Sequence, residues 1–172
     1  MRTSLFNIVK ILLIPYFVIV LSSCSTAKVS PTPDLVWKVA LSKYEIKDSL
    51  SSVESVTQYN GSVTKVNHQQ SPDSGDVYLI MDVTVSKTGD QSATFDWQNL
   101  VIEDASGNTY HRLDNDTFLE QYQYTPRITG LALRLGEYSG WMCYEVPTSA
   151  AKGKLTLSYT GEGSQQQIVL QQ

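Results

Sequence analysis

The feature that most constrains this fold is the spacing of apolar residues along positions 77–86. An apolar side chain recurs at every second position, at Val77, Leu79, Met81, Val83 and Val85. Successive side chains of a β-strand point to opposite faces of a sheet, so this spacing places all five on one face. The pattern predicts a strand with that face in a hydrophobic core.

The same period recurs from Leu35 onward, where Trp37, Val39 and Leu41 alternate with Lys38, Ala40 and Ser42. Further strands are predicted at residues 62–67, 93–103, 108–113, 128–135, 138–146, 154–160 and 165–171. Turn-forming residues separate the strands at Asn60-Gly61, Ser74-Gly75-Asp76, Thr88-Gly89-Asp90, Ser106-Gly107-Asn108, Gly136 and Gly161-Glu162-Gly163.

Helical spacing is nearly absent from the chain. We expect a turn or two of helix near residues 48–56 and 114–123 and nowhere else. About eight to nine short strands, separated by turns at this density, predict an all-β fold, an antiparallel β-sandwich that spans residues 35–172.

The amino terminus has the layout of an export signal. Residues 1–10 carry Arg2 and Lys10 and no acidic residue, and the apolar run at residues 11–21 follows them. A membrane-spanning helix needs about 20 predominantly apolar residues, and this run is shorter. Residues 1–23 are therefore predicted to be a signal peptide.

The residues that close this segment, Leu21, Ser22, Ser23 and Cys24, resemble the lipobox of bacterial lipoproteins. The resemblance implies cleavage before Cys24, attachment of diacylglycerol to its thiol, and often acylation of the new amino terminus. An ordinary secretory signal and an uncleaved anchor are the alternatives. Two or more acyl chains anchor a protein stably, so we expect an extracytoplasmic protein held by lipid on the cell membrane or the outer membrane.

Residues 24–34 are expected to comprise the lipidated cysteine and a flexible tether. The stretch 25–33 is small and polar and contains two prolines. At about 3.1 Å per residue, these nine residues span roughly 28 Å when extended. A partner of the domain should therefore lie within a few tens of ångströms of a membrane surface.

Removal of the signal leaves 149 residues, enough for one domain that buries roughly two-thirds of its unfolded surface. Eleven basic and seventeen acidic residues remain, a net charge of −6. This charge argues against nucleic acid as a partner, because nucleic-acid binding rests on neutralising phosphates with basic side chains. Cys143 is the only cysteine besides Cys24, so no internal disulfide is expected.

Turn formers and core residues in three stretches, 75–110, 133–147 and 154–159, form a recognisable motif. The motif positions are Gly75, Val83, Val85, Thr88, Gly89, Phe95, Trp97, Asp104, Gly107, Tyr110, Leu133, Gly136, Gly140, Tyr144, Glu145, Val146 and Pro147. The pattern resembles the telokin-like immunoglobulin-fold domains of bacterial surface lipoproteins and of certain secreted actinobacterial antigens. Lys87 departs from the pattern, because the family usually has asparagine there.

The resemblance implies an immunoglobulin-like sandwich that acts as a non-enzymatic interaction module. Such motifs specify a fold and carry no catalytic roles, and the family is largely without assigned activity.

No residues with catalytic spacing stand out. His68 and His111 are the first candidate bases, and neither has a convincing partner in the sequence. Residues 136–140 contain a serine between two glycines but miss the spacing of a nucleophile elbow, so we expect a hairpin turn there. We predict no catalytic residues and no cofactor, and a hydrolase assembled from distant residues is the less favoured alternative.

Two metal sites are conceivable from residue types alone. His111, Met142 and Cys143 would suit copper, but alternation directs Met142 and Cys143 to opposite faces of a strand. Carboxylates that would offer oxygens to calcium occur at Glu103, Asp104, Asp114 and Asp116. No calcium-binding loop motif accompanies them, so no metal ligand is predicted and a copper- or calcium-binding envelope lipoprotein is the alternative function.

The most suggestive surface stretch is residues 118–124, in a connection with few strand signals. Tyr122 and Tyr124 offer rigid, amphipathic contact area, and Trp97 and Trp141 are candidate neighbours on a sheet face. The alternative is that these aromatics cover the open end of the sandwich. We predict a lipoprotein whose non-catalytic domain binds a protein, a peptide or a component of the cell envelope.

Overall fold

The computed structural model describes residues 36–88, 92–130 and 132–170. All described residues belong to one compact unit, Thr32–Gln172. The predictions for the signal peptide, for Cys24 and for the tether therefore fall outside the described part of the chain. Among the described residues, no helix is long and apolar enough to cross a membrane.

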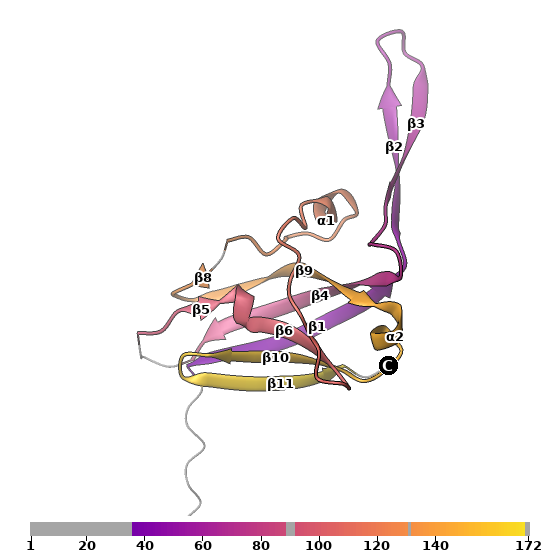
Figure 1. Ribbon diagram of the computed structural model, residues 1–172. Coiled ribbons are helices and arrows are strands. Elements are labelled where there is room, and N and C mark those ends of the chain that lie inside the picture. The colour runs from indigo at the N-terminus through magenta and orange to yellow at the C-terminus, as the bar shows by residue number, and fades with distance from the viewer. Residues whose placement is uncertain (1–35, 89–91, 131, 171–172) are drawn as a thin grey trace, which may run out of the picture. The chain divides into compact units, whose positions relative to one another are not determined.

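Two antiparallel sheets face each other in a sandwich (Figure 1). One sheet has the order β1 (Trp37–Lys47), β4 (Asp76–Lys87), β9 (Glu137–Pro147). The other has the order β11 (Ser164–Leu170), β10 (Leu155–Gly161), β6 (Leu100–Asp104), β7 (Thr109–Tyr110). Facing sheets of three and four antiparallel strands are typical of immunoglobulin folds, so the predicted fold class is confirmed.

The remaining described elements are short or lie outside these two sheets. They are the hairpin β2 (Leu50–Thr57) and β3 (Val63–Gln70), the pair β5 (Phe95–Asp96) and β8 (Ala132–Leu133), the 3-10 turn η1 (Trp97–Asn99), and the single helical turns α1 (Phe118–Gln121) and α2 (Thr148–Ala151). Of the eleven described strands, three have only two residues, so the eight longer ones agree with the predicted number.

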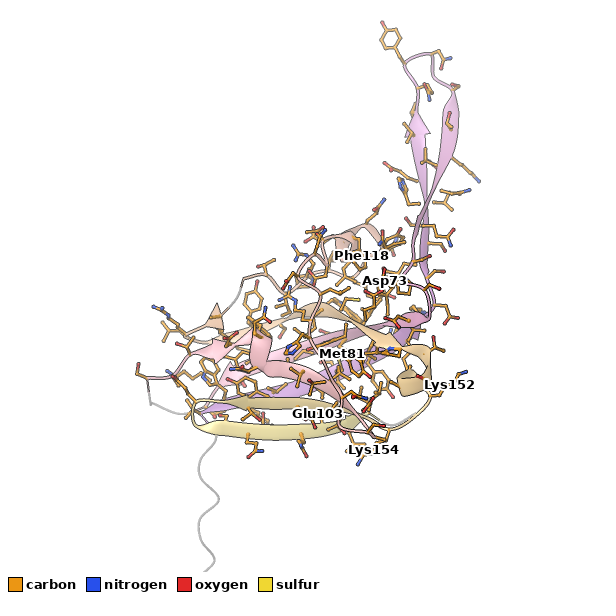
Figure 2. All side chains as sticks on the ribbon, viewed as in Figure 1. Asp73, Met81, Glu103, Phe118, Lys152 and Lys154 are labelled. Carbon is orange, nitrogen blue, oxygen red and sulfur yellow. The ribbon has the colours of Figure 1, made fainter. Side chains whose placement is uncertain are left out.

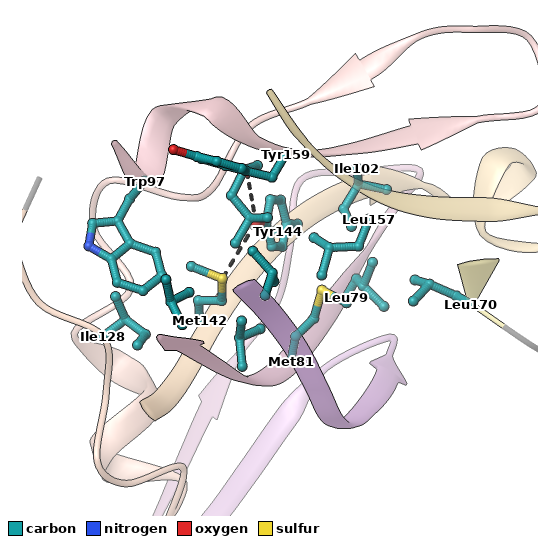
Figure 3. Packing of buried hydrophobic residues seen from close by; sticks show 14 of the residues in the cluster. Leu79, Met81, Trp97, Ile102, Ile128, Met142, Tyr144, Leu157, Tyr159 and Leu170 are labelled. Atoms are coloured by element: carbon teal, nitrogen blue, oxygen red, sulfur yellow. Dashed lines mark hydrogen bonds between the residues drawn. The ribbon is translucent and has the colours of Figure 1, made fainter. Parts of the chain in front are cut away.

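The alternation along β4 places its apolar residues as predicted. Val77, Leu79, Met81, Val83 and Val85 are all at most 2% exposed, and all belong to one buried cluster, here called the main core. Side chains of β6, β9, β10 and β11 complete this cluster between the two sheets, and Figure 3 shows part of it. Burying one such side chain contributes about 1.5–3 kcal/mol, so this layer is the largest stabilising element of the fold.

Strand β1 continues beyond the predicted alternation because its register shifts. Trp37 and Val39 are buried in the main core, and Leu41 packs against it. The pairing with β4 is irregular between Leu41 and Lys43. Up to Leu41 the odd-numbered side chains point to the main core, whereas after the irregularity the even-numbered Tyr44 packs against it. An extra residue in one strand reverses which side chains point inward, so the period-two pattern breaks at this position.

The prediction of helical turns near residues 48–56 is wrong, because these residues form β2. β2 pairs with β3 in register from Leu50 opposite Gln70 to Thr57 opposite Val63, and the predicted turn at Asn60-Gly61 joins them. Most side chains of this hairpin are exposed, and in Figure 1 it extends beyond the sandwich. With few buried residues, the segment carries little hydrophobic pattern, and its strands are set by pairing with each other.

Three predicted strands are also shorter than expected. The stretch 108–113 contains only the two-residue strand β7. The stretch 93–103 is interrupted by the 3-10 turn η1, where the Asp96 side chain accepts a hydrogen bond from the backbone N–H of Gln98. The stretch 128–135 contains only the two-residue strand β8. The helical turn expected within 114–123 is present as α1.

Candidate functional site

The long connection at residues 111–128, here called the strap, crosses the outer face of the β1-β4-β9 sheet. It is hydrogen-bonded along β9: Leu113 donates its N–H to the carbonyl of Cys143 at 2.9 Å, and Ile128 donates to Trp141 at 2.8 Å. The N–H of Trp141 in turn donates to the carbonyl of Pro126 at 2.8 Å. The strap therefore satisfies backbone groups on the edge of β9 that would otherwise be open to another chain.

Gly140 permits this close approach. A Cβ atom at Gly140 would lie 2.7 Å from the carbonyl oxygen of Pro126 and 3.2 Å from the backbone nitrogen of Ile128. Both neighbours are backbone atoms, which cannot swing away as a flexible side chain can. Any larger residue at this motif position would push the strap off β9.

The strap closes a second, smaller core, here called the outer core, on the face of β4 and β9 opposite the main core. Tyr78, Ile80 and Cys143 contribute from the sheet, and Leu119 of α1 and Leu50 at the start of β2 are buried with them. The ring centroids of Tyr78 and Phe118 lie 5.3 Å apart, and Figure 2 labels Phe118 on the strap. The strap is thus anchored by packing as well as by hydrogen bonds.

Three of the four predicted binding residues come together at the margin of the outer core, and we call Tyr122, Tyr124 and Trp141 the aromatic patch. Each is partly buried against the outer core and partly exposed. The rings of Tyr124 and Trp141 meet edge to face, with centroids 4.9 Å apart. This is a favourable geometry for an aromatic pair and holds both rings in a defined orientation.

Trp97 does not share that surface. It is 3% exposed in the main core, where its ring meets Phe95 edge to face at 4.9 Å and Tyr138 at 6.3 Å. The reason is the turn η1, which follows β5 and leaves Trp97 buried instead of continuing a strand. Sequence alternation through residues 93–103 could not anticipate this break.

Charged side chains from β1 border the aromatic patch. Glu45 accepts a hydrogen bond from the hydroxyl of Tyr124 at 3.1 Å and lies 2.5 Å and 3.0 Å from the ammonium groups of Lys43 and Lys47. The ammonium of Lys43 also lies 5.9 Å from the ring centroid of Trp141, within the range of a cation–π contact. The patch therefore combines aromatic faces with both signs of charge.

These contacts shift the pKa values of Glu45 and Tyr124. Hydrogen bonds from Lys43 and Lys47 lower the pKa of Glu45 to about 2. Burial, with a further contribution from the hydrogen bond to Glu45, raises the pKa of Tyr124 to about 12. At neutral pH Glu45 is a carboxylate and Tyr124 is a hydrogen-bond donor, so the orientation of the tyrosine ring is maintained.

A hollow of about 200 Å³ lies beside the aromatic patch. Its walls come from the end of β1, the start of β2 and the strap, and they consist of Lys47, Ser49, Leu50, Ser51, Tyr122 and Tyr124. Aromatic, hydroxyl and ammonium groups around one hollow can make apolar contacts and hydrogen bonds to the same ligand. No sequence motif indicated that the base of the hairpin would meet the strap here.

Cys143 and Met142 point to opposite sides of the sheet, as the alternation predicts. Met142 is buried in the main core and Cys143 in the outer core, where burial raises the pKa of its thiol. A thiol that stays protonated is a poor nucleophile and a poor metal ligand. Within the described residues, no three His, Cys, Asp or Glu side chains gather to hold a metal ion.

The histidines and the candidate serine lie apart from one another in the structure. His68 is on β3, with its Nε2 atom 3.1 Å from a carboxylate oxygen of Glu54, and His111 is exposed at the start of the strap. Gly136 is in the turn before β9, as predicted, but Ser139 is within the strand and hydrogen-bonded to Thr84 at 2.7 Å.

The strap contains one buried carboxylate, Asp116, whereas the neighbouring carboxylates of the strap are exposed to solvent. Asp116 is fully buried, and its carboxylate lies 3.1 Å from Nε of Arg112 and 2.7 Å from Nη1 of Arg127. The sequence indicates Asp116 as a possible calcium ligand, and no motif indicates either arginine. The spacing of Arg112 and Asp116 is four residues, but Arg127 is eleven residues further on, in irregular chain.

The described strands and the strap together define an antiparallel β-sandwich domain with one sheet face covered by its own chain. The model of the family described as a domain of unknown function, DUF4352, matches residues 44–168. This match spans well over half of the chain, and the chain therefore belongs to that family. The predicted membership of a largely unassigned immunoglobulin-like family is confirmed. A search of the curated proteins found no match.

Several solved bacterial structures are similar at low identity. A conserved hypothetical protein of Bacillus anthracis is 16% identical with a TM-score of 0.44, covering 77% of this chain and 87% of that one. The ycdA protein of Bacillus subtilis, named as a candidate lipoprotein, is 14% identical with a TM-score of 0.43, covering 79% and 38%. An uncharacterized β-sandwich protein of Clostridium difficile is 14% identical with a TM-score of 0.41, covering 78% and 85%. Similarities of this size carry no inference about activity.

Proposed function

We propose that this chain is an extracytoplasmic lipoprotein, anchored through lipid on Cys24, whose sandwich is a non-catalytic binding module. The export signal of residues 1–23 and the lipobox residues Leu21, Ser22 and Ser23 support the anchor. The partner is a protein, a peptide or another component of the cell envelope, within reach of the tether.

The observation that carries the binding proposal is the aromatic patch beside its hollow. Tyr122, Tyr124 and Trp141 stay partly exposed although they border a well-packed core, and Tyr124 is held both by Trp141 and by Glu45. Rigid aromatic rings give large contact area at low entropic cost, which is why they recur in binding surfaces. The adjoining lysine and serine side chains supply hydrogen-bond donors at the rim.

Site-specific photocrosslinking in living cells tests the binding proposal. A benzophenone amino acid in place of Tyr122 should give a covalent adduct of defined mass, and the adduct should disappear when Trp141→Ala is introduced. A matched control carries the same group in place of Val169, which is half exposed on β11 of the other sheet. Adducts that are identical at both positions, or absent at position 122, would overturn the proposal.

Loss of folding must be separated from loss of binding. Thermal unfolding of each variant should be measured alongside the crosslinking, and Tyr124→Phe provides a milder change that keeps the ring and removes only the hydrogen bond to Glu45. We expect Tyr124→Phe to retain the adduct, because ring contact area carries the interaction.

Lipid attachment is tested separately. The full-length protein should partition with membranes, and mass spectrometry should find acyl chains on an amino-terminal peptide that begins at Cys24. The Cys24→Ala protein should lose both properties. An unmodified Cys24 in membrane-bound protein would contradict the anchor without touching the binding proposal.

A further inference from the structure

A second hollow, here called the arginine pocket, has a volume of about 280 Å³ and shares no lining residue with the hollow beside the aromatic patch. Arg112, Leu113 and Arg127 of the strap line it together with Trp97. Two arginines therefore line one small pocket of a domain whose net charge is negative. The partners of Arg112 and Arg127 determine which of their N–H groups remain available to a ligand.

Both guanidinium groups are held by fixed partners. The buried Asp116 carboxylate accepts from Nε of Arg112 at 3.1 Å and from Nη1 of Arg127 at 2.7 Å. Nη2 of Arg112 also donates to the carbonyl of Ile128 at 2.5 Å, and Nε of Arg127 donates to Glu120 at 3.4 Å. The side chains are only 12% and 15% exposed, so neither has the freedom of a surface arginine.

In each guanidinium, one nitrogen nevertheless makes no hydrogen bond to the described part of the chain. Nη1 of Arg112 and Nη2 of Arg127 have no hydrogen-bond partner among the described residues. Each of these nitrogens carries two N–H donors, and arginine stays charged at all physiological pH values. Arg112 and Arg127 both line the pocket, and Asp116 and the Ile128 carbonyl already hold their guanidinium groups in place.

The charges around the pocket favour a singly charged anion. Asp116 is buried beside the two guanidinium groups, so it balances one of their two charges without screening by water. Asp114 also lines the pocket but is exposed, and Glu120 is 57% exposed, so water screens both. These carboxylates would repel a dianion more strongly than a monoanion.

We propose that the arginine pocket binds a carboxylate, presented by the end of a peptide chain or by a small organic acid. A carboxylate is planar and singly charged, and it matches the geometry of guanidinium N–H groups. At about 30 Å³ per water molecule, the pocket has the volume of roughly nine waters, which suits a terminal residue or two. Trp97 and Leu113 provide apolar wall for its side chain. This site goes beyond the proposed function, because its lining residues differ from those of the hollow beside the aromatic patch.

Calorimetric titration of the full-length protein in detergent micelles tests the proposal. The probes are acetyl-trialanine with a free carboxylate, the same peptide as its carboxamide, sodium butyrate and inorganic phosphate. The free acid should bind at least about tenfold more tightly than the carboxamide, because the amide lacks the charged acceptor. Binding of butyrate as well as the peptide identifies small acids as ligands, and binding of the peptide alone identifies chain ends.

Three results would overturn the proposal: equal binding of acid and carboxamide, no binding of either acid at millimolar concentration, or tighter binding of phosphate than of the peptide. None of them bears on crosslinking at the aromatic patch, so the two proposals fail independently.

Variants must distinguish binding from folding, since removal of Arg112 or Arg127 leaves Asp116 short of partners. Thr129→Phe avoids this, because Thr129 is an exposed residue on the wall of the pocket, and among the described residues its side chain bonds only to the hydroxyl of Tyr138. We expect Thr129→Phe to abolish peptide binding with an unchanged thermal midpoint. Asp114→Asn should strengthen binding by removing a negative charge. Unchanged affinity in Thr129→Phe would place the peptide elsewhere and reject the pocket.

Discussion

The hydroxyl of Tyr144 lies 2.9 Å from the carbonyl oxygen of Leu100, so a hydrogen bond joins β9 of one sheet to β6 of the other through the middle of the main core (Figure 3). The sulfur of Met142 is 3.4 Å from the same hydroxyl, and all of these groups are shielded from water. Burial raises the pKa of Tyr144, which therefore stays a neutral donor. The facing sheets are held by this directional contact as well as by apolar packing.

Tyr144→Phe should lower the free energy of unfolding by about 1–1.5 kcal/mol, since it removes one buried hydrogen bond and keeps the ring. Urea denaturation should show a lower midpoint with an unchanged slope. Tyr138→Phe is the matched control, because within the described residues the Tyr138 hydroxyl bonds only to Thr129, near the surface, and its loss should cost much less. Equal losses in the two variants would contradict a special role for the bond between the sheets.

Gly140→Ala should destabilise the domain by about 1–3 kcal/mol, the usual cost of forcing an extra carbon into a packed site. Hydrogen exchange should become faster at Ile128 and Trp141, whose N–H groups bond between the strap and β9. Gly153→Ala is the control, since a Cβ there meets only an ordinary contact at 3.5 Å. Protection that is unchanged at Ile128 would show that the strap can move without loss.

Asp104 should titrate well below an ordinary aspartate. The side-chain amide of Asn108 lies 2.8 Å from its carboxylate and is the main cause that lowers the pKa to about 2, while the Tyr110 hydroxyl donates at 2.9 Å. Because the pKa is lowered by folding, the ionised form stabilises the native state above about pH 4, and this contribution disappears as the pH falls towards 2. Carbon-13 NMR of the carboxyl group should record this midpoint, and a value near 4 would contradict the structure.

Tyr124 should ionise near pH 12. Its pKa is raised by folding, so its contribution to stability is complete below about pH 10 and is lost as the pH rises towards 12. Tyrosinate absorbance of the wild type minus that of Tyr124→Phe isolates this group. Glu45→Gln should shift the transition to lower pH, because it removes the negative acceptor of the hydroxyl. No shift in Glu45→Gln would mean that burial alone raises this pKa.

The extent of sequence-based prediction differs between the sheets and the candidate site. The main-core face of β4 follows from the sequence residue by residue, because alternate side chains of a strand lie on one face. The burial of Tyr78 and Ile80 on the other face does not follow from it, because the strap covers them. Trp97 was misplaced, since a single 3-10 turn after β5 moves it from a strand face into the main core. Tyr122, Tyr124 and Trp141 were named together, but their contact with β1 and with the base of the hairpin was not foreseen.

By itself, the sequence determined the all-β class, most turns and the main-core face of β4, because local periodicity and turn chemistry depend on neighbouring residues. Only the tertiary structure decided that the strap covers the second face of the β1-β4-β9 sheet and that Asp116 meets Arg127. Contacts between segments far apart in irregular chain have no periodic signature. They arise from the packing of particular side chains, such as Leu119, and from the absence of a side chain at Gly140, which lets the backbone of the strap approach β9.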